Sequence, residues 1–265
     1  MKWHEMTSPQ VAELSASDPV AILPVAAIEQ HGPHLPLSTD VEIGEGLVHA
    51  AVAGLDDVPH VVLPVQTLGA SPEHLSFPGT LTLTPDSLGD TLVEVAGSLH
   101  QSGIRRLVLS NSHGGNKAVL DSASLQIRFE YDMLVVKANY FRFPRPAGVE
   151  LPETEWVHGL HGGAIETAMM LHLRPELVRH AEISRFESFG EELEDRLTWV
   201  RPEGVAPFAW LARDLNPSGV TGDATLATAA LGHRLVEHYA GILADIVRDA
   251  HAFPVERLGA SDTLG

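Results

Sequence analysis

Short apolar runs alternate with stretches of helical pattern through the first 140 residues, and no other feature of the chain restricts its fold as strongly. The apolar runs cover residues 20–25, 61–65, 106–110 and 133–137, and the helical patterns between them cover about 41–52, 85–102 and 117–130. Strands that alternate with helices of this length are typical of βαβ units, in which helices cover both faces of a parallel sheet. The sequence therefore predicts an α/β fold that binds its ligands beyond the carboxyl ends of the strands.

The second half of the chain is less regular. Residues 141–156 are rich in Pro and Arg and are expected to run over the surface, and residues 186–216 are expected to form a mobile flap. One helix is expected to begin near residue 163 and to end before Pro175, and another is expected from residue 221 to residue 251. The chain has no repeat, low-complexity stretch or linker, so residues 1–265 are predicted to form a single domain.

The charge balance and the residue types present exclude several classes of protein. Lys and Arg number 17 and Asp and Glu number 35, which gives a net charge of -18, so nucleic-acid binding is disfavoured. The absence of cysteine excludes disulfide scaffolds, thiolate zinc fingers, iron–sulfur sites and cysteine nucleophiles. No run of about 18 uncharged apolar residues occurs, and no apolar leader is visible, so we expect a soluble cytoplasmic protein without a membrane partner.

Histidine is frequent, with 15 residues against 17 Lys and Arg, and it clusters with carboxylates where strands are expected to end. Glu29, His31 and Asp40 follow the first strand within twelve residues, together with His34. Carboxylate oxygens combined with neutral imidazoles suit Zn²⁺, Mn²⁺ or Fe²⁺ better than Ca²⁺. The alternative is that Asp40 or Thr39 caps the next helix and the histidines are solvated loop residues.

A second group, His113-Gly114-Gly115-Asn116, follows the third strand directly. Its glycines permit positive φ and close backbone approach, Asn116 is suited to cap the next helix, and His113 lies at the same sheet edge as the first group. The rival interpretation is a phosphate cradle in a nucleotide-binding α/β protein, because glycines before a helix N-terminus form anion sites. The chain has no GxGxxG or Walker lysine pattern, however, and Lys117 is the one basic residue nearby.

Two further segments carry candidate residues. His161 precedes a helix, and Glu166 lies in the first turn of that helix, where a carboxylate often serves only the helix dipole. Glu73 and His74 lie in a loop rich in Gly, Ser and Pro, and they form a weaker candidate because loop histidines are usually solvated.

Taken together, these segments resemble the creatininase family of metal-dependent amidohydrolases. The matching pieces are VAAIEQHGPHLP at 25–36 with TD at 39–40, SPEH at 71–74 with FPGT at 77–80, NSHGGN at 111–116, HGGAIET at 161–167, and GVTGD at 219–223, which is expected to open the last helix. They span residues 20–235 in the family's order. The resemblance implies a three-layer α/β/α fold with a mainly parallel central sheet, a binuclear metal centre and a homo-oligomer such as a hexamer.

Carried over by position, the resemblance implies that Glu29, Asp40 and His113 hold one divalent ion. His31 and Asp40 would hold the second, with Asp40 bridging the two. We therefore expect two divalent ions per chain, Zn, Mn or Fe, because oxygen and imidazole ligands accept several first-row ions. The family's catalytic histidine corresponds to His161.

The chain departs from creatininase itself at positions that matter for ligands and substrate. Creatininase has a further metal ligand, a Glu, at the position of Gly115, and we expect Glu166 to take its place. The creatininase tyrosine corresponds to Gly114, and its tryptophan corresponds to Val157, beside Trp156. Creatinine is therefore not the expected substrate. Relatives with the His-Gly-Gly-Asn form include a formamidopyrimidine ribonucleotide deformylase and a peptidase that trims the mycofactocin precursor.

The expected reaction is hydrolysis of an amide C–N bond in a small-molecule substrate, such as a cyclic amide or a formamide. A hydroxide that bridges the two ions attacks the carbonyl, His161 protonates the departing nitrogen, and His74 orients the substrate or stabilises the oxyanion. The substrate is expected to contact Ser71, Gly114, Gly115 and Trp156. The alternatives are a metallopeptidase of the mycofactocin-precursor type and a non-catalytic metal- or ligand-binding protein, which only the missing Glu at position 115 favours.

Overall fold

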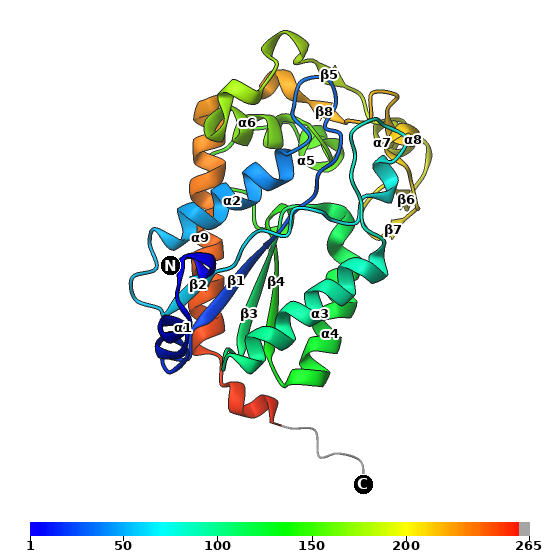
Figure 1. Ribbon diagram of the computed structural model, residues 1–265. Coiled ribbons are helices and arrows are strands. Elements are labelled where there is room, and N and C mark those ends of the chain that lie inside the picture. Colours follow the sequence, from blue (N-terminus) through cyan, green and yellow to red (C-terminus); the bar gives the residue numbers. More distant parts are fainter. Residues whose placement is uncertain (260–265) are drawn as a thin grey trace.

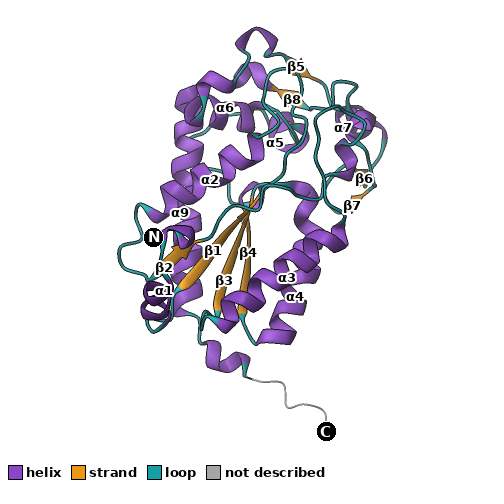
Figure 2. Ribbon diagram, viewed as in Figure 1, coloured by secondary structure: helices purple, strands orange, loops and turns teal. Residues whose placement is uncertain are grey.

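The computed structural model describes residues 1–259 and has a four-stranded parallel sheet at its centre (Figures 1 and 2). The strands are β1 (Val20–Val25), β2 (His60–Val62), β3 (Arg106–Asn111) and β4 (Leu134–Asn139), in the order β2-β1-β3-β4. β1 and β3 pair along their whole length, and every residue of both strands is buried because helices cover both faces. The predicted α/β fold is confirmed.

Helices form a layer on each face of this sheet (Figure 1). α3 (Pro85–Gln101) and α4 (Lys117–Tyr131) share one hydrophobic core with Ala21 and Leu23 of β1. α2 (Thr39–Val52) and α9 (Ala229–Ala252) share a second core, on the opposite face, with Val20 and Ile22. Successive side chains of a strand point to opposite faces of its sheet, so this alternation along β1 produces the three-layer α/β/α arrangement.

Most predicted boundaries agree with the structure to within one or two residues. Thr84 caps α3 by accepting a hydrogen bond from the Ser87 main-chain N–H, and Pro85 is the first residue of that helix, as predicted. β2 ends at Val62 instead of continuing to residue 65. The parallel register is lost there, because Gln66 donates its N–H to the Pro24 main-chain oxygen in place of Val65.

The last helix begins at Ala229, and the prediction that it begins at residue 221 is wrong. Thr228 caps it by accepting a hydrogen bond from the Leu231 main-chain N–H. The residues before it form β8 (Gly222–Asp223), which pairs antiparallel with β5 (Arg185–Phe186). Gly222 has a φ of 116°, which no residue of a right-handed helix adopts. The GVTGD segment therefore belongs to a loop that precedes the helix.

Short elements fill the two irregular segments. The surface excursion leads into α5 (Glu153–His158). Residues 186–216 contain α7 (Phe189–Arg196), β6 (Val200–Arg201), β7 (Ala206–Pro207) and α8 (Ala212–Leu215). Arg213 of α8 donates a hydrogen bond to the Ser76 main-chain oxygen and lies over the Phe77 ring. This contact attaches the 186–216 segment to the loop before α3. The mobility of the segment stays a prediction.

The two remaining helices are α1 (Ser8–Ser15), near the start of the chain, and α6 (Ala164–Leu173), which packs against α2 and α9. No helix within residues 1–259 is long and apolar enough to cross a membrane. Because β1, β3 and β4 are parallel, their carboxyl ends meet at one edge of the sheet. The chain that leaves β1 and β3 at this edge carries the first two candidate groups.

Candidate metal centre

Glu29, His31, Asp40 and His113 meet at the carboxyl edge of the sheet, and each is exposed by 4% or less. Glu29 and His31 follow β1, Asp40 lies in the first turn of α2, and His113 follows β3. The Nε2 of His31 lies 3.4 Å from Asp40 Oδ1. The Nδ1 of His113 lies 3.4 Å from Asp40 Oδ2 and 3.2 Å from Glu29 Oε1. Asp40 therefore stands between the two histidines with one oxygen toward each.

Several of the atoms that face one another have no hydrogen-bond partner within the described part of the chain. They are both carboxylate oxygens of Glu29, Asp40 Oδ2 and His31 Nε2. A buried polar atom without a partner costs about 1–3 kcal/mol, and native proteins rarely keep one. A cation bound among these atoms would satisfy them together. Carboxylate and imidazole donors suit Zn²⁺, Mn²⁺ and Fe²⁺, so the residues present fit a divalent metal.

The far ring nitrogen of each of these two histidines faces a main-chain carbonyl. His31 Nδ1 donates to the Glu29 main-chain oxygen at 3.1 Å, and His113 Nε2 donates to the Ala70 main-chain oxygen at 3.1 Å. A proton on the far nitrogen leaves a lone pair on the near nitrogen, which is the form that a metal binds. The hydrogen bonds thus orient both rings so that the nitrogen nearer the carboxylates is the one a metal would bind.

Glu166, in the first turn of α6, belongs to the same group of side chains. Its Oε2 lies 3.8 Å from His31 Nε2 and accepts a hydrogen bond from the Gly162 main-chain N–H at 2.6 Å. Its Oε1 accepts a hydrogen bond from the Tyr140 hydroxyl at 3.4 Å. Burial raises the pKa of Glu166 to about 7, against the opposing charge of His31. Gly115 has no side chain to bind a metal, and the position of Glu166 beside His31 suits it to provide that ligand instead.

Tyr140 was missed by the sequence analysis. It directly follows β4 at the edge where β1 and β3 also end, so the rule that ligands lie beyond strand ends would have pointed to it. Burial, followed by the charges of Glu166 and Asp40, raises its pKa well above the usual value for tyrosine. The hydroxyl therefore stays protonated and can donate a hydrogen bond to Glu166.

The carboxylates give the centre a strong attraction for positive charge. Burial lowers the pKa of His31, but Asp40, Glu166 and Glu29 outweigh it and raise that pKa to about 9. Burial also opposes protonation of His113, and Glu29 and Asp40 again outweigh it, so its pKa lies well above 6.5. The pKa of Glu29 is lowered well below its usual value because His113 and the other histidines outweigh burial. A metal that binds here must therefore displace protons.

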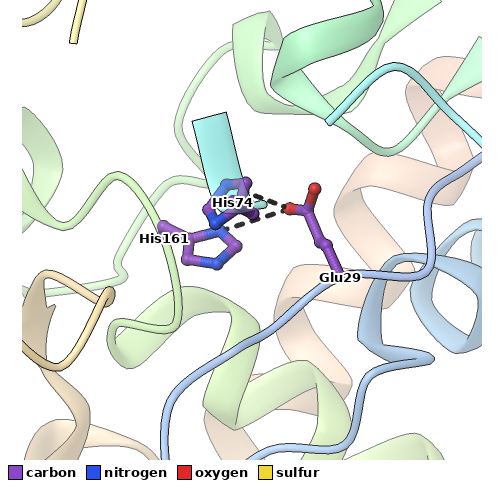
Figure 3. A group of neighbouring side chains, drawn as sticks. All are labelled: Glu29, His74 and His161. Carbon is purple, nitrogen blue, oxygen red and sulfur yellow. Dashed lines mark ion pairs between the residues drawn. The ribbon is translucent and has the colours of Figure 1, made fainter. Parts of the chain in front are cut away.

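His74 and His161 both point at the same oxygen of Glu29 (Figure 3). His74 Nε2 lies 3.5 Å and His161 Nδ1 lies 3.7 Å from Glu29 Oε1, and the two ring centroids are 4.3 Å apart. Burial lowers the pKa of His74 to about 4. Burial, helped by the charges of His31 and His74, lowers the pKa of His161 well below its usual value. Both imidazoles are therefore neutral near pH 7, and each can exchange a proton or share a hydrogen bond.

The interpretation of the first group as a helix cap with solvated histidines does not hold. Ser38 is the N-cap residue of α2, and neither Asp40 nor Thr39 caps the helix. His34 is fully buried, and its Nε2 donates to the Gly162 main-chain oxygen at 2.9 Å. His34 thus supports the loop that precedes α6 and is not one of the ligand candidates.

Two expectations for the second group are wrong. Asn116 occupies the N-cap position of α4, but its side chain makes no capping hydrogen bond. The buried amide instead donates to the Ala26 main-chain oxygen and accepts from the Ala70 main-chain N–H, so it joins loops far apart in sequence. Neither Gly114 nor Gly115 adopts positive φ. Glycine is required at position 115 for a different reason: a Cβ there would lie 2.4 Å from the Ala70 main-chain oxygen. A Cβ at Gly114 would meet open space.

The residues expected to contact the substrate have different surroundings. Ser71 is fully buried, and its Oγ lies 3.2 Å from His113 Nε2, on the far side of that ring from Glu29. Trp156 is half-buried against the core between α6 and α9, with the Arg145 guanidinium 4.9 Å from its ring centroid. The substrate contacts of these residues stay predictions.

The chain matches the family model for creatinine amidohydrolase (Creatininase) over residues 4–247. The mycofactocin precursor peptide peptidase of Mycolicibacterium smegmatis is 32% identical over 242 residues, which cover 89% of this chain and 87% of that protein. The creatinine amidohydrolase of Pseudomonas putida is 32% identical over 182 residues, which cover 63% of this chain and 69% of that protein.

Solved structures of creatininase have the same fold as this chain. The crystal structure of creatinine amidohydrolase superposes with a TM-score of 0.75 at 27% identity and covers 96% of this chain and 98% of its own. A manganese form of creatininase gives a TM-score of 0.73 at 27% identity, with the same coverage of 96% and 98%. A Zn–Zn form of a creatininase mutant gives 0.73 at 27% identity over 96% and 98%. The chain therefore belongs to the creatininase family.

Proposed function

We propose that this chain is a metal-dependent hydrolase of amide C–N bonds. The observation that carries the proposal is the buried group of unpartnered carboxylate and imidazole atoms on Glu29, His31 and Asp40. Two neutral histidines, His74 and His161, lie beside this group and face the same carboxylate oxygen. A metal centre with acid–base groups next to it has the parts that hydrolysis requires.

Two divalent ions form part of the proposal. Glu29, Asp40 and His113 would hold one, and His31, Asp40 and Glu166 would hold the other. Zn, Mn and Fe all suit these donors, and the zinc and manganese forms of creatininase support the first two. When bound, such ions polarise a carbonyl and bring the pKa of a water molecule toward neutrality.

The protein's own residues would move protons and hold the substrate's oxygen. Hydrolysis places a hydroxyl on the carbonyl carbon and a proton on the departing nitrogen. His161 is the most exposed of the four histidines, with a side chain 11% accessible, and it is neutral near pH 7, so it is suited to accept a proton and pass it to that nitrogen. His74 is suited to hydrogen-bond the carbonyl oxygen as negative charge develops on it.

The proposed substrate is a small-molecule amide, such as a cyclic amide or a formamide. Open space lies beside Gly114, where creatininase has a tyrosine, so the substrate need not resemble creatinine. A peptidase is the second candidate, because the mycofactocin precursor peptide peptidase of M. smegmatis covers 89% of this chain. The same open space would leave room for a peptide.

A substrate panel tests the proposal. Protein loaded with Zn²⁺ or Mn²⁺ is incubated with creatinine, hydantoin, an N-formyl amine and short peptides, and products are measured by mass spectrometry. Hydrolysis that stops with a chelator and resumes with added metal supports the proposal, and the class of compound hydrolysed distinguishes the amidohydrolase from the peptidase. Binding of two ions without hydrolysis of any compound contradicts it and favours the non-catalytic binding protein.

We also propose that the chain acts as a homo-oligomer, such as a hexamer, in the cytoplasm. Leu125 and Phe129 lie one turn apart on α4 and are 72% and 76% exposed, and Trp199 is 66% exposed. Large apolar side chains in such positions are often covered by another copy of the chain. Light scattering on the purified protein measures its mass, and a monomer of 28.5 kDa would contradict the oligomer.

A further inference from the structure

Gln30 lies between two proposed metal ligands in the sequence, yet its own side chain is hydrogen-bonded to none of the proposed ligands. It is 5% exposed, and both ends of its amide are fixed. The Oε1 accepts a hydrogen bond from the Gly32 main-chain N–H at 3.0 Å, and the Nε2 donates to the Gly219 main-chain oxygen at 2.6 Å. An amide turned the other way would set oxygen against oxygen and N–H against N–H, so these contacts settle which end carries the hydrogens.

The same amide nitrogen determines the protonation of His74. Gln30 Nε2 lies 2.8 Å from His74 Nδ1. An amide nitrogen can only donate, so His74 Nδ1 must accept, and the single proton of the neutral ring sits on Nε2. That Nε2 is the atom 3.5 Å from Glu29 Oε1, so His74 presents an N–H group to the centre.

The main-chain carbonyl of Gln30 determines the protonation of His161. His161 Nε2 lies 2.7 Å from the Gln30 main-chain oxygen. A carbonyl can only accept, so the proton of His161 sits on Nε2 and its Nδ1 carries a lone pair. That Nδ1 is the atom 3.7 Å from Glu29 Oε1, so His161 presents an acceptor to the centre.

We propose that Gln30 is a positioning residue that fixes His74 and His161 in the same tautomer but with opposite ends toward the centre. One residue thereby supplies the centre with one hydrogen-bond donor and one proton acceptor. This inference rests on the proposed function for its catalytic meaning, whereas the tautomers themselves follow from the hydrogen bonds alone.

The proposal also separates His74 from the metal ligands. Glu29, His74 and His161 bring three ligand-type atoms within 4.8 Å of one another, a spacing that a cation could share. The proton on His74 Nε2 removes the lone pair that such a cation would need. By contrast, an N–H in this position suits a carbonyl oxygen that gains negative charge.

Gly219 shows how closely the amide of Gln30 is held. Its φ is 79°, and a Cβ there would lie 2.7 Å from Gln30 Nε2 and 2.5 Å from the Phe77 ring. A side chain at this position would displace the amide nitrogen from His74. Gly219→Ala therefore disturbs Gln30 from the opposite side without replacing either histidine.

The test reads the tautomers directly by magic-angle-spinning ¹⁵N NMR on Zn²⁺-loaded protein that carries ¹⁵N-labelled histidine. Signals are assigned by their loss in His74→Gln and His161→Gln. In the native sequence, both Nδ1 atoms are expected to be unprotonated and both Nε2 atoms protonated. An unprotonated Nε2 on His74 overturns the proposal, whether or not any substrate has been found.

Gln30→Glu is the decisive variant because a carboxylate of the same shape has no hydrogen to donate to His74. His74 is expected to move its proton to Nδ1, while His161 stays unchanged because it depends on the main chain of residue 30. Gly219→Ala is expected to shift the His74 signals in the same way, so the test survives if one variant does not fold. Unchanged His74 signals in both folded variants overturn the proposal.

Turnover gives a second readout, whose result is independent of the NMR result. With a hydrolysed amide in hand, Gln30→Glu is expected to retain its zinc and to lower kcat by about 10²-fold, the effect of losing one oxyanion donor, with a smaller change in KM. Changed tautomers with unchanged kcat overturn the catalytic meaning assigned to Gln30. A complete lack of hydrolysis by the native sequence contradicts the proposed function and leaves the NMR result standing.

Discussion

Asp40 Oδ1 lies 3.4 Å from His31 Nε2, although the two residues come from different elements, the first turn of α2 and the loop after β1. Both side chains are 2% exposed or less. The other oxygen of Asp40 faces His113 at 3.4 Å. One carboxylate thus links the two halves of the proposed metal centre, and its removal should affect both.

Asp40→Ala is expected to reduce metal content from two equivalents per chain to one or none. The measurement is mass-spectrometric metal analysis of protein purified without chelator. Asp86→Ala is the matched control, because Asp86 also lies in the first turn of a helix but is exposed. If Asp40→Ala keeps two equivalents, Asp40 does not bridge the ions.

His161→Ala is expected to keep its metal and to lower kcat by about 10²–10⁴-fold, the usual contribution of a general acid or base. His161 reaches the centre only through Nδ1, which faces Glu29, so its loss should leave the ligands in place. His49→Ala, at an exposed position near the end of α2, is the control. Turnover that survives in His161→Ala would remove this residue from the mechanism.

The positions of the ligand candidates could be predicted because parallel strands end at a common edge. Glu29 and His113 follow β1 and β3, which pair along their whole length, so the topology alone brings them together. Their orientation could not be predicted, because it depends on main-chain carbonyls such as that of Ala70, which lies 43 residues from His113 in sequence.

The residues that sequence reasoning misjudged are those whose roles depend on distant loops. Asn116 is a residue type that often caps helices, but its side-chain amide is hydrogen-bonded to the Ala26 and Ala70 main chains. Gln30 carries no charge and sits between two ligands, so no pattern marks it, although two histidines take their tautomers from it. Such roles follow from tertiary contacts and not from local sequence.

Glu155→Gln is expected to lower the free energy of unfolding by about 1–3 kcal/mol, the usual cost of losing a buried charge-assisted hydrogen bond. The Glu155 carboxylate accepts from the Ala164 and Asp223 main-chain N–H groups, both at 2.6 Å, and so joins the start of α6, three residues after His161, to β8. A Gln amide would set its own N–H groups against one of these donors.

Urea denaturation measures this effect on Glu155. Glu153→Gln is the matched control in the same helix, because Glu153 is exposed, and its loss is expected to change stability by no more than about 0.5 kcal/mol. Equal effects of the two substitutions would mean that Glu155 does not anchor these segments.

His34 should make the protein sensitive to acid. Burial lowers its pKa from 6.5 to about 4, so the folded state binds its proton less tightly than the unfolded state does. The stability that neutral His34 allows is complete above pH 6.5 and is lost as the pH falls toward 4. His34→Gln is therefore expected to flatten the decline in unfolding free energy between pH 6.5 and 4.5. A decline as steep as that of the native sequence would show that other groups cause it.

Gly114 and Gly115 are adjacent, but substitution by Ala is expected to impair the protein only at position 115. A Cβ at position 115 would lie 2.4 Å from both the Ala70 main-chain oxygen and His113 Nε2, so it must displace the ring whose other nitrogen faces the proposed metal. Gly115→Ala is expected to lower the unfolding free energy by about 1–3 kcal/mol and to weaken metal binding, both measurable by calorimetry.

Gly114→Ala is the internal control for this pair. It adds a methyl group to open space at a negative φ, so stability should stay within about 0.5 kcal/mol of the native value and metal binding should not change. If both variants behave alike, the two glycines act as a flexible pair, as a phosphate cradle would require. If only Gly115→Ala is impaired, the Ala70 main-chain oxygen, 2.4 Å from that Cβ, excludes a side chain at position 115.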